Sequence, residues 1–133
     1  MNEVKIQTKN ELLHVLSENR EALKSYGVNR LGIFGSFCKE TNTEESDVDL
    51  LVDFEPNRKS FDNFMDLNFF LEDLFGRKVE MVTPQSLSKF IGPHILNEVQ
   101  YVQHLISNWF NIFFSIFIIM HEESLPYLLT QFF

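Results

Sequence analysis

The amino-acid sequence predicts an α/β (α+β) domain built on a small mixed sheet with helices packed on one face. Three short runs have the length and apolar character of strands, at residues 30–34, 48–54 and 78–82. Longer segments with apolar residues at helical spacing lie before the first run and between the second and the third. A chain of 133 residues suits one domain with a single core.

Capping residues and chain breakers mark the ends of the predicted helices. A Thr-x-x-Glu capping box opens a helix over residues 8–26, and a serine cap opens a second helix over residues 60–75. A glycine follows each of them and ends it. Gly92 and Pro93 then interrupt the chain, and we predict a last helix over residues 95–102.

The C-terminal part of the chain has a different character from the rest. Residues 1–102 form the predicted domain, and residues 103–133 form an atypical apolar extension that we expect to be helical. Residues 109–120 are apolar almost all round, but a membrane helix needs roughly 17–25 such residues and flanking basic anchors. A packing or oligomerising helix is therefore our first interpretation. An accidental extension of the reading frame is the second, and a membrane segment is the third.

Composition excludes several classes of function. The formal charge of −8 argues against direct nucleic-acid binding, which needs clustered basic residues. Cys38 is the only cysteine, which excludes an internal disulfide and predicts a cytoplasmic protein. The four histidines lack the spacing of a zinc site. Basic residues are scattered and predict a solvated surface, at positions 20, 24, 30, 58, 59, 77 and 78.

The most informative motif joins the first two predicted strands. Gly35 and Ser36 follow the first strand, and after ten further residues Asp47 and Asp49 open the second. Side chains alternate along a strand, so the two carboxylates project from the same face, roughly 6–7 Å apart. Paired carboxylates suit Mg²⁺, which is usually shared with substrate phosphates. The preceding turn offers backbone N–H groups and a hydroxyl to such phosphates.

A third carboxylate and a basic residue extend this motif. Glu80 lies in the middle of the third predicted strand, where an apolar residue is otherwise expected. Adjacent strands lie roughly 4.8 Å apart, so a strand beside Asp49 can present Glu80 to the same metal. Lys39 follows the glycine turn and can neutralise phosphate as a point charge.

These residues, in this order and spacing, resemble the minimal nucleotidyltransferase (MNT) proteins of the DNA polymerase β-like nucleotidyltransferase superfamily. The resemblance covers about residues 10–102, and it is carried by residues 31–37, 46–52, 78–84 and 95–102. It implies the polymerase β-like palm fold and nucleotidyl transfer from ATP with two Mg²⁺ ions. The implied catalytic and metal residues are Asp47, Asp49 and Glu80, and the implied phosphate-binding residues are Gly35, Ser36 and Lys39.

The same resemblance implies a partner. Minimal proteins of this type commonly pair with HEPN toxin ribonucleases, so the leading hypothesis is an antitoxin that transfers AMP from ATP to a tyrosine hydroxyl of its HEPN partner. Two alternatives stay open. One is a catalytically silent MNT-fold antitoxin that neutralises its partner by binding, because relatives often have Arg-Gly where this chain has Lys39 and Glu40. The other is a small-molecule (antibiotic) nucleotidyltransferase.

Overall fold

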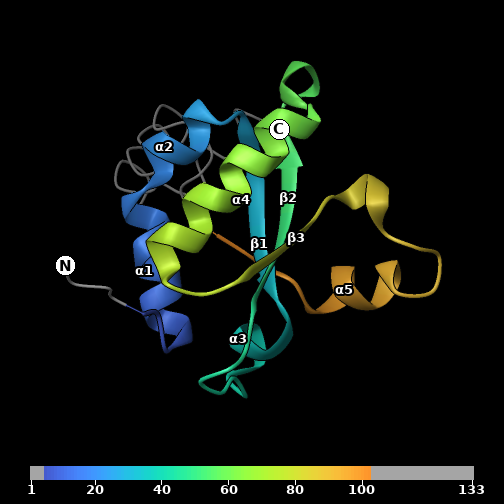
Figure 1. The fold of residues 1–133 in the computed structure, drawn as a ribbon. Coiled ribbons are helices and arrows are strands. Elements are labelled where there is room, and N and C mark those ends of the chain that lie inside the picture. Colours follow the sequence, from blue (N-terminus) through green and yellow to red (C-terminus); the bar gives the residue numbers. More distant parts are fainter. Residues whose placement is uncertain (1–4, 103–133) are drawn as a thin grey trace, which may run out of the picture.

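The computed structural model describes residues 5–102, so the predictions for residues 103–133 lie outside the described residues. The elements follow in the order α1 (Lys9–Glu18), α2 (Arg20–Ser25), β1 (Val28–Phe34), α3 (Gly35–Lys39), β2 (Val48–Phe54), α4 (Phe61–Phe75), β3 (Val79–Val82), α5 (Gly92–Glu98) and β4 (Gln100–Tyr101). Short 3-10 turns lie at Pro56–Arg58 and Pro84–Ser86. The fold is the mixed α/β architecture that the sequence predicts (Figure 1).

The four strands form one mixed sheet in the order β3-β2-β1-β4. Strand β1 runs antiparallel to both β2 and β4, whereas β2 and β3 are parallel. The long helix α4 makes the crossover between the two parallel strands. This topology places the end of β1, the start of β2 and the middle of β3 beside one another, because Phe34 pairs with Asp49 and Asp49 pairs with Glu80.

The two faces of the sheet are covered differently. Helices α1, α2 and α4 pack on one face, and α5 lies on the other side (Figure 1). The helix-covered face holds the main core, in which leucines of α1, α2 and α4 meet Leu31, Ile33, Leu50 and Val52 of the two central strands. A smaller apolar cluster of Phe34, Leu51 and Ile95 lies under α5. The remainder of that second face carries the candidate site.

Local sequence explains where the helices begin and end. Thr8 caps α1 by accepting the Glu11 N–H, and Ser60 caps α4 by accepting the Asn63 N–H. Gly76 ends α4 in the left-handed conformation, with φ of 64°. The single helix predicted over residues 8–26 is divided at Asn19, so two helices occupy this stretch. Among the residues described, no helix is long and apolar enough to cross a membrane.

The helix predicted over residues 95–102 is wrong in its position. Gly92 and Pro93 begin α5 instead of interrupting the chain, and the helix ends at Glu98. Proline is well suited to the first turn of a helix because its missing N–H would have no partner there. The next residues form β4 against β1, and the Val102 N–H donates to the Leu31 carbonyl at 2.8 Å. Pairing with an otherwise open sheet edge thus outweighs the local helical pattern.

Candidate active site

The turn at Gly35 lies directly against the carboxylate of Asp49 on β2. Gly35 has φ of 71°, a backbone conformation that favours glycine. A Cβ atom added at this position would collide with the Asp49 carboxylate. Two separate constraints therefore require glycine at position 35: the left-handed backbone of the turn and the close approach of the Asp49 side chain. The turn predicted to hold phosphates and a predicted metal ligand are side by side as a result.

Asp49 and Glu80 form the centre of the site. They are register partners on β2 and β3, and both belong to the face opposite the main core. Burial is the largest of the causes that together raise the pKa of Asp49 to about 6, and it is followed by the charge of Glu80 and a hydrogen bond with Glu80. The charges of Asp47 and Glu98 act in the same direction. Asp49 is thus surrounded by negative charge.

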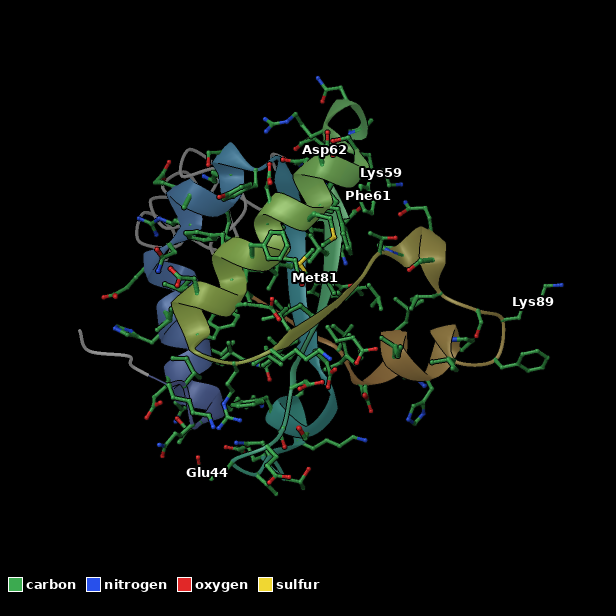
Figure 2. All side chains as sticks on the ribbon, in the orientation of Figure 1. Glu44, Lys59, Phe61, Asp62, Met81 and Lys89 are labelled. Carbon is green, nitrogen blue, oxygen red and sulfur yellow. The ribbon has the colours of Figure 1, made fainter. Side chains whose placement is uncertain are left out.

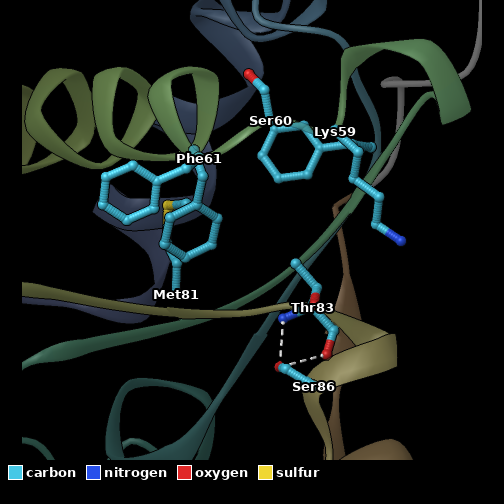
Figure 3. A pocket seen from close by; sticks show the side chains of 8 residues that line it. Lys59, Ser60, Phe61, Met81, Thr83 and Ser86 are labelled. Atoms are coloured by element: carbon cyan, nitrogen blue, oxygen red, sulfur yellow. Dashed lines mark hydrogen bonds between the residues drawn. The ribbon is translucent and has the colours of Figure 1, made fainter.

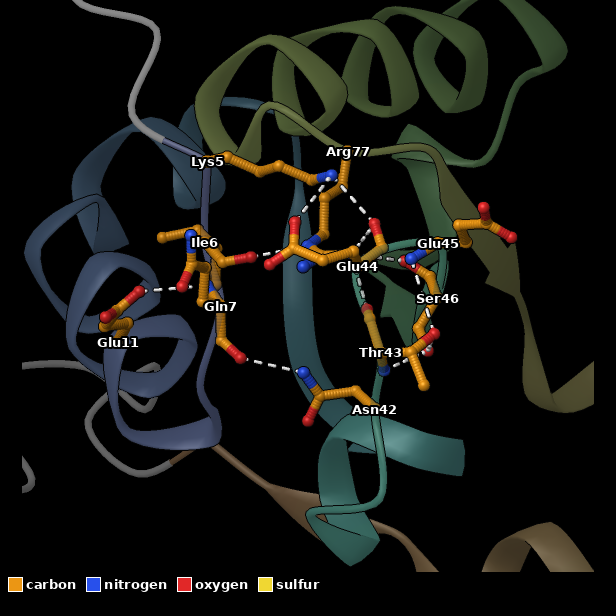
Figure 4. Close-up of polar contacts among 10 residues, drawn as sticks. All are labelled: Lys5, Ile6, Gln7, Glu11, Asn42, Thr43, Glu44, Glu45, Ser46 and Arg77. Atoms are coloured by element: carbon orange, nitrogen blue, oxygen red, sulfur yellow. Dashed lines mark hydrogen bonds and ion pairs between the residues drawn. The ribbon is translucent and has the colours of Figure 1, made fainter.

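Asp47 is half-buried in the loop immediately before β2. Arg77 holds this loop, because its guanidinium donates to the carbonyl oxygens of Thr43 at 3.1 Å and Ser46 at 2.9 Å (Figure 4). Arg77 also donates to the Ile6 carbonyl, and its side chain is 7% exposed. The prediction that Arg77 belongs to a solvated surface is wrong. The N–H groups of its guanidinium thus take the place of water as hydrogen-bond donors to these backbone carbonyl groups.

Glu98 is a site residue that sequence reasoning did not assign. It stands at the end of α5, and its Oε1 accepts the Gly35 N–H at 3.2 Å. Its Oε2 lies 3.2 Å from the Lys39 ammonium and 3.6 Å from His94 Nε2. Desolvation opposes the charged form, but the Gly35 N–H, Lys39 and His94 outweigh it and lower the pKa of Glu98. The sequence contains one indication of this role, because Glu98 is an acidic residue in the largely apolar segment 95–102.

The two other predicted phosphate-binding residues lie on α3, the short helix after the turn. Ser36 is half-buried in its first turn, and its backbone carbonyl accepts the Thr41 N–H at 2.9 Å. Lys39 ends the helix with a side chain that is 55% exposed. Gly35 and Lys39 therefore both contact the Glu98 carboxylate.

The carboxylates of the site are potential ligands for a metal ion. Within residues 5–102, no three His, Cys, Asp or Glu side chains are grouped closely enough to form a ready cage. Mg²⁺ does not need such a cage, because it is usually held by one or two carboxylates together with substrate phosphates and water. Asp49 and Glu80 supply that oxygen pair, and a cation would balance the negative charge that Glu80, Asp47 and Glu98 place around Asp49. The residues present fit Mg²⁺.

Two cavities lie away from these carboxylates. One of about 220 Å³ is farther along β2 and is lined by Arg30, Leu51, Asp53, Pro84, Leu96 and Tyr101. The other, of about 390 Å³, has mainly apolar walls and lies under the start of α4 (Figure 3). Figure 2 shows Lys59 and Phe61 at that end of the molecule, far from α3. Neither cavity is lined by Asp49 or Glu80, so the chemistry belongs to the open face and not to the larger hollow.

A mixed sheet with a glycine turn between β1 and β2, and with acidic register partners on β2 and β3, defines a polymerase β-like nucleotidyltransferase palm. Comparison with known proteins agrees. Residues 16–103 match the family described as the nucleotidyltransferase domain. This chain belongs to that family and is an enzyme of the nucleotidyltransferase class.

This chain aligns with nearly the whole length of individual relatives. The protein adenylyltransferase MntA of Thermococcus cleftensis is 38% identical over 96 residues, which are 71% of this chain and 96% of the relative. A solved structure of a candidate minimal nucleotidyltransferase is 33% identical, with a TM-score of 0.56, and the match covers 66% of this chain and 93% of that one. A toxin–antitoxin crystal structure with AMP-PNP shares the fold at 15% identity and a TM-score of 0.54, covering 96% and 100% of the two chains.

Proposed function

We propose that this protein is an Mg²⁺-dependent antitoxin that transfers AMP from ATP to a tyrosine hydroxyl of a HEPN ribonuclease toxin and releases pyrophosphate. The observation that carries the proposal is the contact of the Gly35 turn with the Asp49 carboxylate, because nucleotidyl transfer needs phosphate and metal ligands at one place. The name of the Thermococcus relative, protein adenylyltransferase, supports AMP as the transferred group. The toxin–antitoxin neighbour with AMP-PNP supports both a toxin partner and an adenine nucleotide.

The residues of the site then have distinct tasks. The Gly35 N–H and the Ser36 hydroxyl would donate to the β- and γ-phosphates, and Lys39 would balance their charge. Asp47, Asp49 and Glu80 would hold two Mg²⁺ ions. When bound, Mg²⁺ neutralises the charge that develops on the transferring phosphoryl group. Glu80 lies on the exposed edge strand β3, where its carboxylate would also accept the proton of the acceptor hydroxyl.

The open face of the sheet suits a protein acceptor. Glu80 is exposed, and neither of the two described cavities is lined by Glu80 or by its register partner Asp49. A small bare palm gains little binding energy from an acceptor by itself, so a docked partner protein would supply the rest. Addition of AMP near a ribonuclease site would then block RNA through charge and size.

The proposal is tested by transfer of label from α-³²P ATP with Mg²⁺ to a candidate HEPN partner encoded beside this protein. We expect label on the partner, and we expect Asp47→Ala/Asp49→Ala to abolish it. A Tyr→Phe change at the labelled residue of the partner identifies the acceptor. Asp66→Asn, on the exposed side of α4, is the control for loss of one acidic residue. Tight complex formation without label, in folded protein, would favour a silent antitoxin that acts by binding.

A further inference from the structure

The Glu98 carboxylate occupies the donors that a triphosphate would need. Its two oxygens contact the Gly35 N–H at 3.2 Å and the Lys39 ammonium at 3.2 Å. Both groups are predicted phosphate ligands, and one backbone N–H serves a single acceptor well. A phosphate oxygen and the Glu98 oxygen therefore compete for the same hydrogen. They also carry charge of the same sign, so they repel each other at this distance.

The backbone of Glu98 is held in place, whereas its side chain can move away from these donors. Its backbone is fixed, because its carbonyl accepts the Cys38 thiol at 3.5 Å and β4 begins two residues later. Its side chain is 19% exposed and has three rotatable bonds, so it can leave the turn while α5 stays in place. Lys39 is more exposed and can turn from one anion to the other.

We propose that Glu98 is an internal anion that holds the triphosphate site of the free enzyme and is displaced when nucleotide binds. The inference rests on the proposed function for the identity of the ligand. In the free enzyme, Glu98 keeps Gly35 and Lys39 in position, and it lowers the affinity for nucleotide. Charge-assisted hydrogen bonds of this kind are strong, but partial exposure weakens them, so the effect on affinity is about five- to tenfold.

The experiment measures binding of AMP-PNP with Mg²⁺ by calorimetry, using the full chain and no acceptor. Glu98→Gln keeps the size of the side chain and removes its charge, so we expect Kd to fall about five- to tenfold. Glu98→Asp keeps the charge on a shorter side chain that cannot reach both donors, and its Kd should fall as well. Glu21→Gln, on exposed α2, removes the same charge elsewhere and should leave Kd within about twofold. Inorganic tripolyphosphate should show the same ranking.

The outcomes separate this inference from the proposed function. An unchanged or weaker affinity in Glu98→Gln and Glu98→Asp overturns the role of Glu98, even if label transfer succeeds. Tighter binding in both variants supports it, even if no acceptor is ever labelled. A loss of affinity joined to a loss of turnover would assign Glu98 to ligand binding or catalysis instead. Absence of AMP-PNP binding in every protein would overturn the inference together with the nucleotide site.

Discussion

Asp49 and Glu80 are register partners on parallel strands, and the Glu80 carboxylate makes Asp49 harder to ionise. Two like charges at a single strand spacing are costly in a site that is partly shielded from water. Proteins keep such pairs where a cation or a proton will resolve the repulsion. The arrangement therefore links the stability, the metal affinity and the activity of this protein, and each link can be measured.

Replacement of Glu80 by Gln should lower the pKa of Asp49. Burial is the largest cause of the raised value, so the pKa should fall from about 6 without reaching the ordinary 3.8. The midpoint is measured from the Asp49 side-chain ¹³C shift in metal-free protein. Label transfer should fall about a hundredfold or more, because the proposed metal ligand and proton acceptor is lost. A midpoint that stays at about 6 would mean that Glu80 does not contribute to the raised pKa of Asp49.

Replacement of Asp49 by Asn should stabilise the metal-free protein, but only at higher pH. Folding raises the pKa of Asp49 above 3.8, so the wild type loses stability as the pH rises through about 6. Asn has no charge to bury. Asp49→Asn should therefore gain about 1 kcal/mol at pH 7.5, a value discounted for the partial exposure of Asp49, and nothing at pH 3.5. Urea unfolding in EDTA measures this difference.

The control for this prediction is Asp66→Asn on α4, which removes an exposed carboxylate. Addition of Mg²⁺ provides a second reading, because it should stabilise the wild type and leave Asp49→Asn unchanged. A gain of stability that persists at pH 3.5 would contradict the titration of Asp49 as its cause.

The strands and the long helix of this fold could be predicted because their signals are local. Strand β2 and helix α4 have the predicted bounds, since a cap, a glycine stop and a continuous apolar run each act over a few residues. The alignment of Glu80 with Asp49 was predicted as a possibility, and the register makes it definite. The contacts of Glu98 and Arg77 span more than thirty residues of sequence and leave no local pattern. Strand β4 was missed for the same reason.

Replacement of Gly35 by Ala should damage the site more than an equal backbone change elsewhere. A left-handed backbone costs a residue with a Cβ about 1–2 kcal/mol, and here the new atom also collides with the Asp49 carboxylate. Stability should fall by more than that range, and transfer should fall about a hundredfold through displacement of the turn. Gly76→Ala is the matched control for backbone strain, because φ is 64° there and Gly76 is the C-cap of α4. Equal losses of activity in the two variants would show that backbone strain alone is responsible.

Replacement of Arg77 by Met should loosen the loop that carries Asp47. The guanidinium donates to the buried carbonyl oxygen of Ile6 and to the partly buried carbonyl oxygens of Thr43 and Ser46, and all three lose this donor in the variant (Figure 4). Each unsatisfied group costs about 1–3 kcal/mol, and relaxation of the exposed loop recovers part of this, so we expect a net loss of about 2–4 kcal/mol. Arg77→Lys should lose less, because a single ammonium replaces the fork only in part.

Activity distinguishes a positioning role for Arg77 from a purely structural one. Well below the unfolding temperature, Arg77→Met should still transfer label about tenfold more slowly, because Asp47 is no longer held in place. Lys78→Met changes the exposed neighbouring residue and should leave both stability and transfer close to wild type. If Arg77→Met transfers at the wild-type rate once it is folded, the network of Arg77 stabilises the fold without positioning Asp47.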